Sequence, residues 1–175
     1  MPLPVAHSLV GASLVAAVLP RAGRAGYWAA LAGGALVANA ADLDFGLSFA
    51  LGSRGWHRGF THSLVFALAV LLCLLLALGR RRAREAVAFG LAYASHALLD
   101  FATTMRGGGV ELFWPFSAER LGLRRWALSE LPSRLPAADI LKFLSLEFLL
   151  FAPPLLLLIL LRRGVFRRAS ATGVD

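Results

Sequence analysis

Residues 64–79 read LVFALAVLLCLLLALG, and the arginines Arg80 to Arg82 follow them directly. None of these apolar residues carries a charge. A bilayer core about 30 Å thick needs roughly 20 mainly apolar residues of helix to cross it. Counted from His62, the segment 62–79 approaches this length. It therefore predicts a transmembrane helix that ends at a basic membrane boundary.

The composition of the whole chain agrees with a membrane protein. Its 175 residues are 58% hydrophobic and 16% charged, whereas soluble chains carry about 25% charged residues. This composition argues against a disordered chain and against a cytosolic globular domain. The single cysteine, Cys73, excludes a disulfide-rich scaffold.

Four other apolar segments complete the predicted architecture. We expect one all-α domain over residues 1–175, a polytopic membrane helix bundle of about five transmembrane helices. The first two segments are short enough to be tilted, re-entrant or partly interfacial. Pro153 and Pro154 should kink the last helix because they remove backbone donors. The predicted spans are residues 3–19, 27–41, 62–79, 86–105 and 140–161.

The arginines predict how the chain is threaded. Ten of the 18 Lys and Arg residues lie in three short segments that five alternating spans place on one side. The positive-inside rule assigns that side to the cytoplasm, which puts the N-terminus outside and the tail 162–175 inside. Because MPLPVAHSL has no basic side chain, we expect the first segment to be retained rather than cleaved as a signal peptide. The predicted location is the bacterial cytoplasmic (inner) membrane. The ten arginines are Arg21, Arg24, Arg80, Arg81, Arg82, Arg84, Arg162, Arg163, Arg167 and Arg168.

The long outer loop, residues 106–139, is rich in aromatic side chains. It contains LFWPFS at 112–117 and Trp126, and aromatic residues favour the membrane–water interface. We expect this loop to lie as an interfacial cap over the outer ends of the helices. A net charge of +8 could also suggest nucleic acid. Because topology explains the basic residues, we expect no nucleic-acid partner.

A few ionisable residues lie within or beside the predicted spans. Such residues are costly in a membrane and are functional candidates by default. The topology drawn from the arginines alone brings all of them to the outer side. The candidate metal ligands are His7, Asp42, Asp44, His57, His62, His96, Asp100 and, more weakly, Glu147.

The spacing of these residues adds detail. His96 and Asp100 are four residues apart and share a helix face, so they can bind one ion together. Asp42 and Asp44 are two residues apart, so on a regular helix their side chains would point in different directions. We therefore expect them where a helix unwinds into a loop. There each points at a different ion, or one of the two orients a ligand. In HRGFTHS (57–63) a turn at Gly59 would bring His57 and His62 together, with Thr61 or Ser63 capping the next helix.

Each residue alone also has a structural interpretation. A lone aspartate at a helix end is often a solvated terminus, and Glu147 could pair with Lys142. Three motifs on one side, DLD (42–44), HRGFTHS (57–63) and SHALLD (95–100), favour a metal site instead. Imidazole and carboxylate ligands suit zinc best in our interpretation, with manganese or iron as alternatives, and one or more ions.

DLD, HRGFTHS, the HxxxD pair and WPF (114–116), in this order, resemble the YdjM-like family of inner-membrane proteins, described as metal-dependent hydrolases. The resemblance runs from His7 to the last span. It implies that the family's polar signature falls on His7, Asp42, Asp44, His57, His62, His96 and Asp100. The pattern is also remotely similar to zinc-dependent phospholipase C and the related single-strand nucleases. This second similarity implies only the general class of substrate, a phosphoester.

The predicted function is a membrane-embedded metal-dependent hydrolase that acts on a phosphoester of a lipid or lipid-linked substrate at the outer interface. Asp42 or Asp44 could serve as general base. Arg58 could act in catalysis and hold the substrate phosphate, with Arg124 and Arg125 as weaker substrate contacts. The alternatives are an ion-coupled or proton-coupled transporter and a non-catalytic scaffold stabilised by metal.

Overall fold

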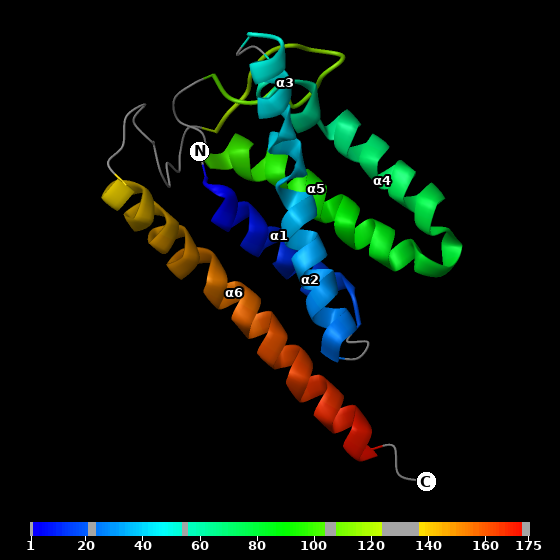
Figure 1. The fold of residues 1–175 in the computed structure, drawn as a ribbon. Coiled ribbons are helices and arrows are strands. Elements are labelled where there is room, and N and C mark those ends of the chain that lie inside the picture. The colour runs from blue at the N-terminus through cyan, green and yellow to red at the C-terminus, as the bar shows by residue number, and fades with distance from the viewer. Residues whose placement is uncertain (1, 21–23, 54–55, 104–107, 124–136, 173–175) are drawn as a thin grey trace.

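The computed structural model describes residues 2–20, 24–53, 56–103, 108–123 and 137–172, and the regular elements of these residues are helices (Figure 1). The α-helices pack mainly around α1 and α5: α1 contacts α2, α5 and α6, while α5 also contacts α2 and α4. The elements are α1 Pro4–Val18, α2 Arg24–Ala38, η1 Ala40–Leu43, α3 Asp44–Ala50, η3 Phe60–His62, α4 Leu64–Leu78, η4 Arg80–Arg82, α5 Ala83–Thr103 and α6 Ala137–Thr172.

Two segments of the described chain are long and apolar enough to cross a bilayer, Arg80–Thr103 and Asp139–Leu161. The other apolar helices are shorter, and α1, α2 and α4 have 15 residues each. At 1.5 Å per residue such a helix is about 22 Å long, against a bilayer core of about 30 Å. The all-helical fold is confirmed, whereas the five-span arrangement is not.

The sequence signals at the two ends of α4 form as expected. The Ser63 hydroxyl accepts a hydrogen bond of 3.0 Å from the Phe66 N–H, which makes Ser63 the N-terminal cap. Gly79 ends the helix at a φ of 69°, a left-handed conformation that favours glycine. Helix α4 is therefore bounded by its own sequence, and η3 with His62 comes directly before it.

Small residues let the central helices approach closely. The core between α1, α2 and α5 is built largely from alanine, including Ala12, Ala16, Ala88 and Ala92. A Cβ added at Gly11 would lie 2.5 Å from the Ala38 Cβ and 2.5 Å from the Gly34 carbonyl oxygen. Close backbone approach through small residues is typical of packing between membrane helices. It brings α1 and the end of α2 into direct contact.

The described part of the expected cap folds against the helix ends. Val110 and Leu112 are buried and cluster with Ala97 of α5. The Leu112 carbonyl accepts a hydrogen bond of 3.0 Å from the Leu64 N–H at the start of α4. The segment therefore contacts both α4 and α5. Residues 124–136, which include Arg124, Arg125 and Trp126, lie outside the described residues.

The ends of α2 and α6 differ from the predicted span ends. Helix α2 ends at Ala38 rather than at residue 41, and the 3₁₀ turn η1 carries Asp42, which agrees with the expected unwinding near DLD. Helix α6 runs through Pro153 and Pro154 to Thr172, past the predicted tail boundary at 162 (Figure 1). Apolar helices tolerate internal proline because nearby groups satisfy the freed carbonyls.

Candidate metal centre

Five of the predicted ligands converge at one end of the bundle. His7 comes from the start of α1, Asp42 from η1, His62 from η3, and His96 and Asp100 from α5. His7, His62, His96 and Asp100 are no more than 1% exposed. The chain thus buries three imidazoles and a carboxylate together, although burying polar groups costs free energy unless they are paired.

The groups face one another at distances that are too long for good hydrogen bonds. His96 Nε2 lies 3.3 Å from Asp42 Oδ1, and His62 Nε2 lies 3.6 Å from the same oxygen. His7 Nε2 lies 3.6 Å from Asp100 Oδ1. Among the described residues these nitrogens and oxygens are buried without a hydrogen-bond partner. Two atoms bound at 2.0–2.1 Å to one tetrahedral ion lie about 3.3–3.4 Å apart, so a metal ion fits this set.

The other ring nitrogens of two histidines are engaged. His96 Nδ1 donates to the Ala38 carbonyl at 2.6 Å. His62 Nδ1 lies 3.0 Å from the Thr61 hydroxyl and 3.3 Å from Asp44 Oδ2. A donating Nδ1–H leaves the Nε2 lone pair of a neutral imidazole available. Metal-ligating histidines typically show this arrangement, with the second nitrogen bonded to a carbonyl or carboxylate.

Asp44 forms the hub of the surrounding hydrogen bonds. It accepts from His57 Nδ1 at 2.8 Å, from the Arg58 N–H at 3.0 Å and from the Thr61 hydroxyl at 2.8 Å. Burial opposes its ionisation, but the hydrogen bonds from His57, His62 and Thr61 outweigh burial and hold the pKa of Asp44 below its usual range. Asp44 therefore orients the two histidines around it.

The Asp42 carboxylate is more exposed to solvent than the Asp44 carboxylate. Its side chain is 18% exposed, whereas that of Asp44 is fully buried. Burial opposes ionisation here too, but contacts with His62 and His96 lower the pKa of Asp42 below its usual range. The group is therefore a carboxylate at neutral pH, as a metal ligand must be.

Three overlapping groups within the described chain could hold a metal ion, each with one ligand atom per residue and all atoms within 4.8 Å of one another. His96 and Asp42 each belong to two of them. The His7 and His96 rings are stacked with centroids 3.8 Å apart. The arrangement suits one ion or two neighbouring ions with mixed nitrogen and oxygen ligands. The groups are His7, His96 and Asp100; Asp42, His62 and His96; and Asp42, Asp44 and His57.

Arg58 lies beside the cluster in an unusual backbone conformation. Its Nε is 3.5 Å from Asp100 Oδ2, and its side chain is 8% exposed. Its φ is 62°, which is uncommon for a residue other than glycine and costs free energy. The bond from its N–H to Asp44 and the bond from the Glu111 N–H to its carbonyl hold this conformation. The predicted cationic residue thus reaches the site.

Exchanging Asp44 for asparagine should weaken metal binding at the two groups that share His96, although neither of these groups contains Asp44. The amide keeps one acceptor oxygen but presents NH₂ where His57 and His62 now meet a carboxylate. Loss of such an orienting partner typically costs 10–100-fold in metal affinity. We expect a loss in this range, measured by zinc competition with a fluorescent chelator. An Asp44→Asn protein with unchanged affinity would contradict the orienting role.

Glu147, the weaker candidate ligand, makes contacts outside the metal-capable groups. It belongs to none of the metal-capable groups among the described residues. Its two carboxylate oxygens accept hydrogen bonds from the Leu3 and Ala6 N–H groups at the start of α1. A carboxylate at a helix N-terminus satisfies free donors and interacts favourably with the helix dipole. Glu147 therefore fastens α6 to the start of α1, next to His7.

The Glu147→Gln substitution tests this role. The amide can satisfy only one of the two buried donors, and an unsatisfied buried donor costs about 1–3 kcal/mol. We expect the free energy of unfolding in detergent to fall by about this amount, with the bound metal retained. Thermal unfolding and elemental analysis check the two parts. Metal loss without destabilisation would instead show that Glu147 is a ligand.

Three contacts at the site were not predicted from the sequence. Thr61 connects Asp44 to His62, and the Tyr93 hydroxyl donates to the Thr61 carbonyl at 2.9 Å. The Asn39 amide donates to the Ser8 hydroxyl at 2.9 Å, which links the end of α2 to α1. A signal existed for two of them: Tyr93 lies three residues before His96, and Asn39 three residues before Asp42. The third connection, through Thr61, had been interpreted only as a possible cap.

Comparison with known proteins relates the chain to inner membrane proteins. The profile of a family described as "YdjM inner membrane protein" matches residues 1–169. The curated "Inner membrane protein YbcI" of Escherichia coli (strain K12) is 44% identical over 92 residues, which cover 49% of this chain and 51% of that protein. The chain thus spans about half the length of this relative. No solved structure matches.

Proposed function

The chain belongs to the YdjM family of inner membrane proteins, and we propose that its buried histidine–aspartate cluster binds a divalent metal ion, most suitably zinc, for hydrolysis. The proposed substrate is a phosphoester of a lipid or lipid-linked molecule. The observation that carries the proposal is the set of buried ring nitrogens and carboxylate oxygens that face one another without hydrogen bonds. A protein gains nothing by burying such groups unless a further species pairs them.

Each residue of the site has a proposed task. His7, His62, His96, Asp42 and Asp100 hold the ion, while Asp44 and the Ala38 carbonyl orient the histidines. The bound ion would supply a water of lowered pKa and polarise the scissile group.

The Arg58 guanidinium, held 3.5 Å from Asp100, would bind the substrate phosphate. Asp42, whose Oδ1 faces His62 and His96, would hold the ion through that oxygen and accept the proton of the attacking water on its other carboxylate oxygen.

We also propose that the site lies at the outer face of the membrane. All five apolar helices would cross, with Asp42 and Asp44 at the outer end of the second span and with the arginine-rich η4 in the cytoplasm. Cys73 gives a way to test this orientation, because it can be replaced by serine and new cysteines placed at Ser53 and at Ala169. An impermeant maleimide applied to intact spheroplasts should label only the Ser53→Cys protein. Labelling of Ala169→Cys alone would reverse the orientation.

The proposed activity is tested with the full chain purified in detergent. Zinc-dependent turnover of a panel of phospholipids and generic phosphodiesters is compared between the parent protein, His96→Ala and Arg58→Gly. Glycine is chosen at Arg58 because it accepts the positive φ. We expect activity to disappear with chelator and return with zinc, to be lost in His96→Ala, and to fall in Arg58→Gly while metal is retained.

Two results would redirect the function. Full metal occupancy without turnover on any substrate would favour a metal-stabilised scaffold. Ion flux in liposomes that depends on the same residues would favour a transporter.

A further inference from the structure

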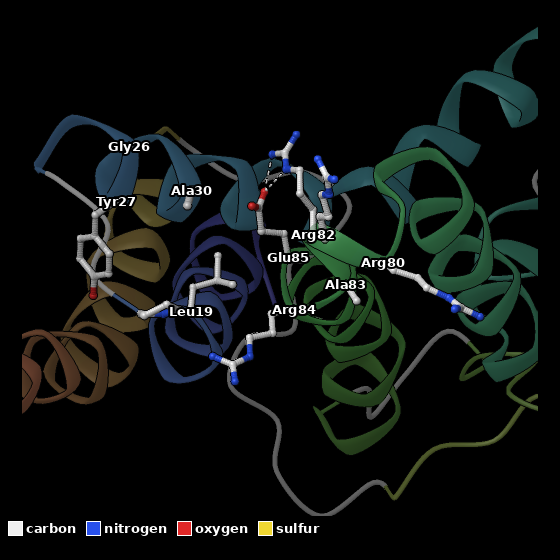
Figure 2. Close-up of a pocket in the computed structure, with 11 residues that line it drawn as sticks. Leu19, Gly26, Tyr27, Ala30, Arg80, Arg82, Ala83, Arg84 and Glu85 are labelled. Atoms are coloured by element: carbon white, nitrogen blue, oxygen red, sulfur yellow. Dashed lines mark hydrogen bonds and ion pairs between the residues drawn. The ribbon is translucent and has the colours of Figure 1, made fainter.

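A second polar site lies at the opposite end of α4 and α5 from the histidine–aspartate cluster. The histidine–aspartate cluster lies next to the start of α4, and η4 follows the end of α4. Because α4 has 15 residues, its two ends are about 22 Å apart. A cavity of about 670 Å³ opens there between the end of α1, the start of α2 and the start of α5 (Figure 2). It is unrelated to the proposed metal chemistry.

One side of the cavity is strongly basic. Arg80, Arg81, Arg82 and Arg84 line it together with one carboxylate, Glu85. Arg82 is paired with Glu85 through a hydrogen bond of 3.0 Å from Nε. The lining therefore keeps an excess of three positive charges at neutral pH. Such an excess favours an anion, and guanidinium groups match the oxygens of phosphate.

The opposite side of the cavity is apolar. Leu19 and Tyr27 are buried at 7% and 3% exposure, and both line the space together with Ala30. Figure 2 shows Arg84 extending toward the Leu19 side and Arg82 over Glu85, with Arg80 directed away from them. A ligand that fills this cavity would present a charged group to the arginines and an apolar part to α1 and α2.

We infer that this cavity binds the phosphate head group of an anionic phospholipid, with Arg81 and Arg84 as its main contacts. The membrane-length segment Arg80–Thr103 begins at the cavity, so the arginines lie where the apolar length of α5 meets water. Basic pockets between membrane helices at this level typically hold anionic lipid head groups. The apolar side of the cavity favours a lipid over a free phosphate, because a phosphate ion has no apolar part to pack against it.

The test uses the delipidated full chain in neutral detergent, which makes it independent of metal and of orientation. Binding of phosphatidylglycerol, phosphatidylcholine and inorganic phosphate is measured by native mass spectrometry and by the shift in thermal unfolding. The test variant is Arg81→Ala/Arg84→Ala. The control Arg167→Ala/Arg168→Ala removes the same charge elsewhere in the chain. An Arg81→Lys/Arg84→Lys variant keeps the charge and tests the planar guanidinium contact.

We expect phosphatidylglycerol to bind at least about 10-fold more tightly than phosphatidylcholine, and the alanine variant to lose roughly 30-fold, the size expected for two basic residues at an anionic surface. The tail control should stay close to the parent, and the lysine variant should lie between the two. Equal binding of both lipids, or an equal loss in the tail control, would overturn the inference. Stabilisation by millimolar inorganic phosphate that matches the lipid would also overturn it, in favour of a soluble phosphate compound.

Discussion

Purified His96→Ala protein is expected to bind zinc more than about 100-fold more weakly than the parent, beyond the 10–100-fold loss typical of an orienting residue. The reason is geometric. His96 Nε2 lies 3.3 Å from Asp42 Oδ1, and His96 belongs both to the group with Asp42 and to the group with Asp100. Its removal therefore takes a ligand from every arrangement that uses α5. Zinc competition against a chelator of known affinity measures the loss.

Ser95→Ala is the matched control for this substitution. Ser95 is the neighbouring residue on α5, is also buried, and directs its hydroxyl to the Ala92 carbonyl at 2.7 Å. Its truncation should leave zinc affinity within about twofold of the parent, because the hydroxyl makes no contact with the cluster. Equal affinities of the His96→Ala and parent proteins would show that the cluster is not where the metal binds.

Replacing Gly11 by alanine should destabilise the protein. The added Cβ would meet the Ala38 Cβ and the Gly34 carbonyl oxygen, both at 2.5 Å, and one of these is backbone that cannot rotate away. Overpacking of this kind costs about 1–3 kcal/mol, occasionally more, which outweighs the gain of about 1 kcal/mol from alanine in a helix. We expect net destabilisation of up to about 2 kcal/mol, measured by unfolding in detergent.

The same substitution should also weaken metal binding. Helix α1 carries His7, and Ala38, whose Cβ a side chain at position 11 would meet, holds His96 Nδ1 through its carbonyl. Pushing α1 away from α2 therefore shifts two candidate ligands at once. Gly26→Ala is the control in α2, because a Cβ there meets nothing within 4 Å. A Gly11→Ala protein as stable as the Gly26→Ala protein would contradict the close packing of α1 on α2.

The sequence predicted the helical fold and the convergence of the polar residues for physical reasons. Long apolar stretches without charges favour helices, and buried histidines and aspartates are too costly to be scattered by chance. The spacing of His96 and Asp100 placed both on one face of α5. The unwinding near DLD followed from the poor fit of Asp42 and Asp44 to a single helix face.

The roles within the site depended on contacts that no spacing reveals. Asp44 could be a ligand or an orienting residue until its bonds to His57 and Thr61 were known. The contacts of Glu147 could not be predicted because its partners are backbone N–H groups 141 and 144 residues away along the chain. The predicted end of the second span, residue 41, lies past the end of α2 because the apolar run continues beyond the point where the helix unwinds at Asn39.

X-ray absorption at the zinc edge of the purified, zinc-loaded full chain tests the central claim most directly. A buried site with histidine and aspartate ligands predicts a first shell of nitrogen and oxygen at about 2.0–2.1 Å. It also predicts the outer-shell scattering of imidazole rings, which should diminish in His96→Ala. A spectrum of zinc surrounded only by oxygen, without imidazole scattering, or a protein that retains no zinc after desalting, would contradict the account.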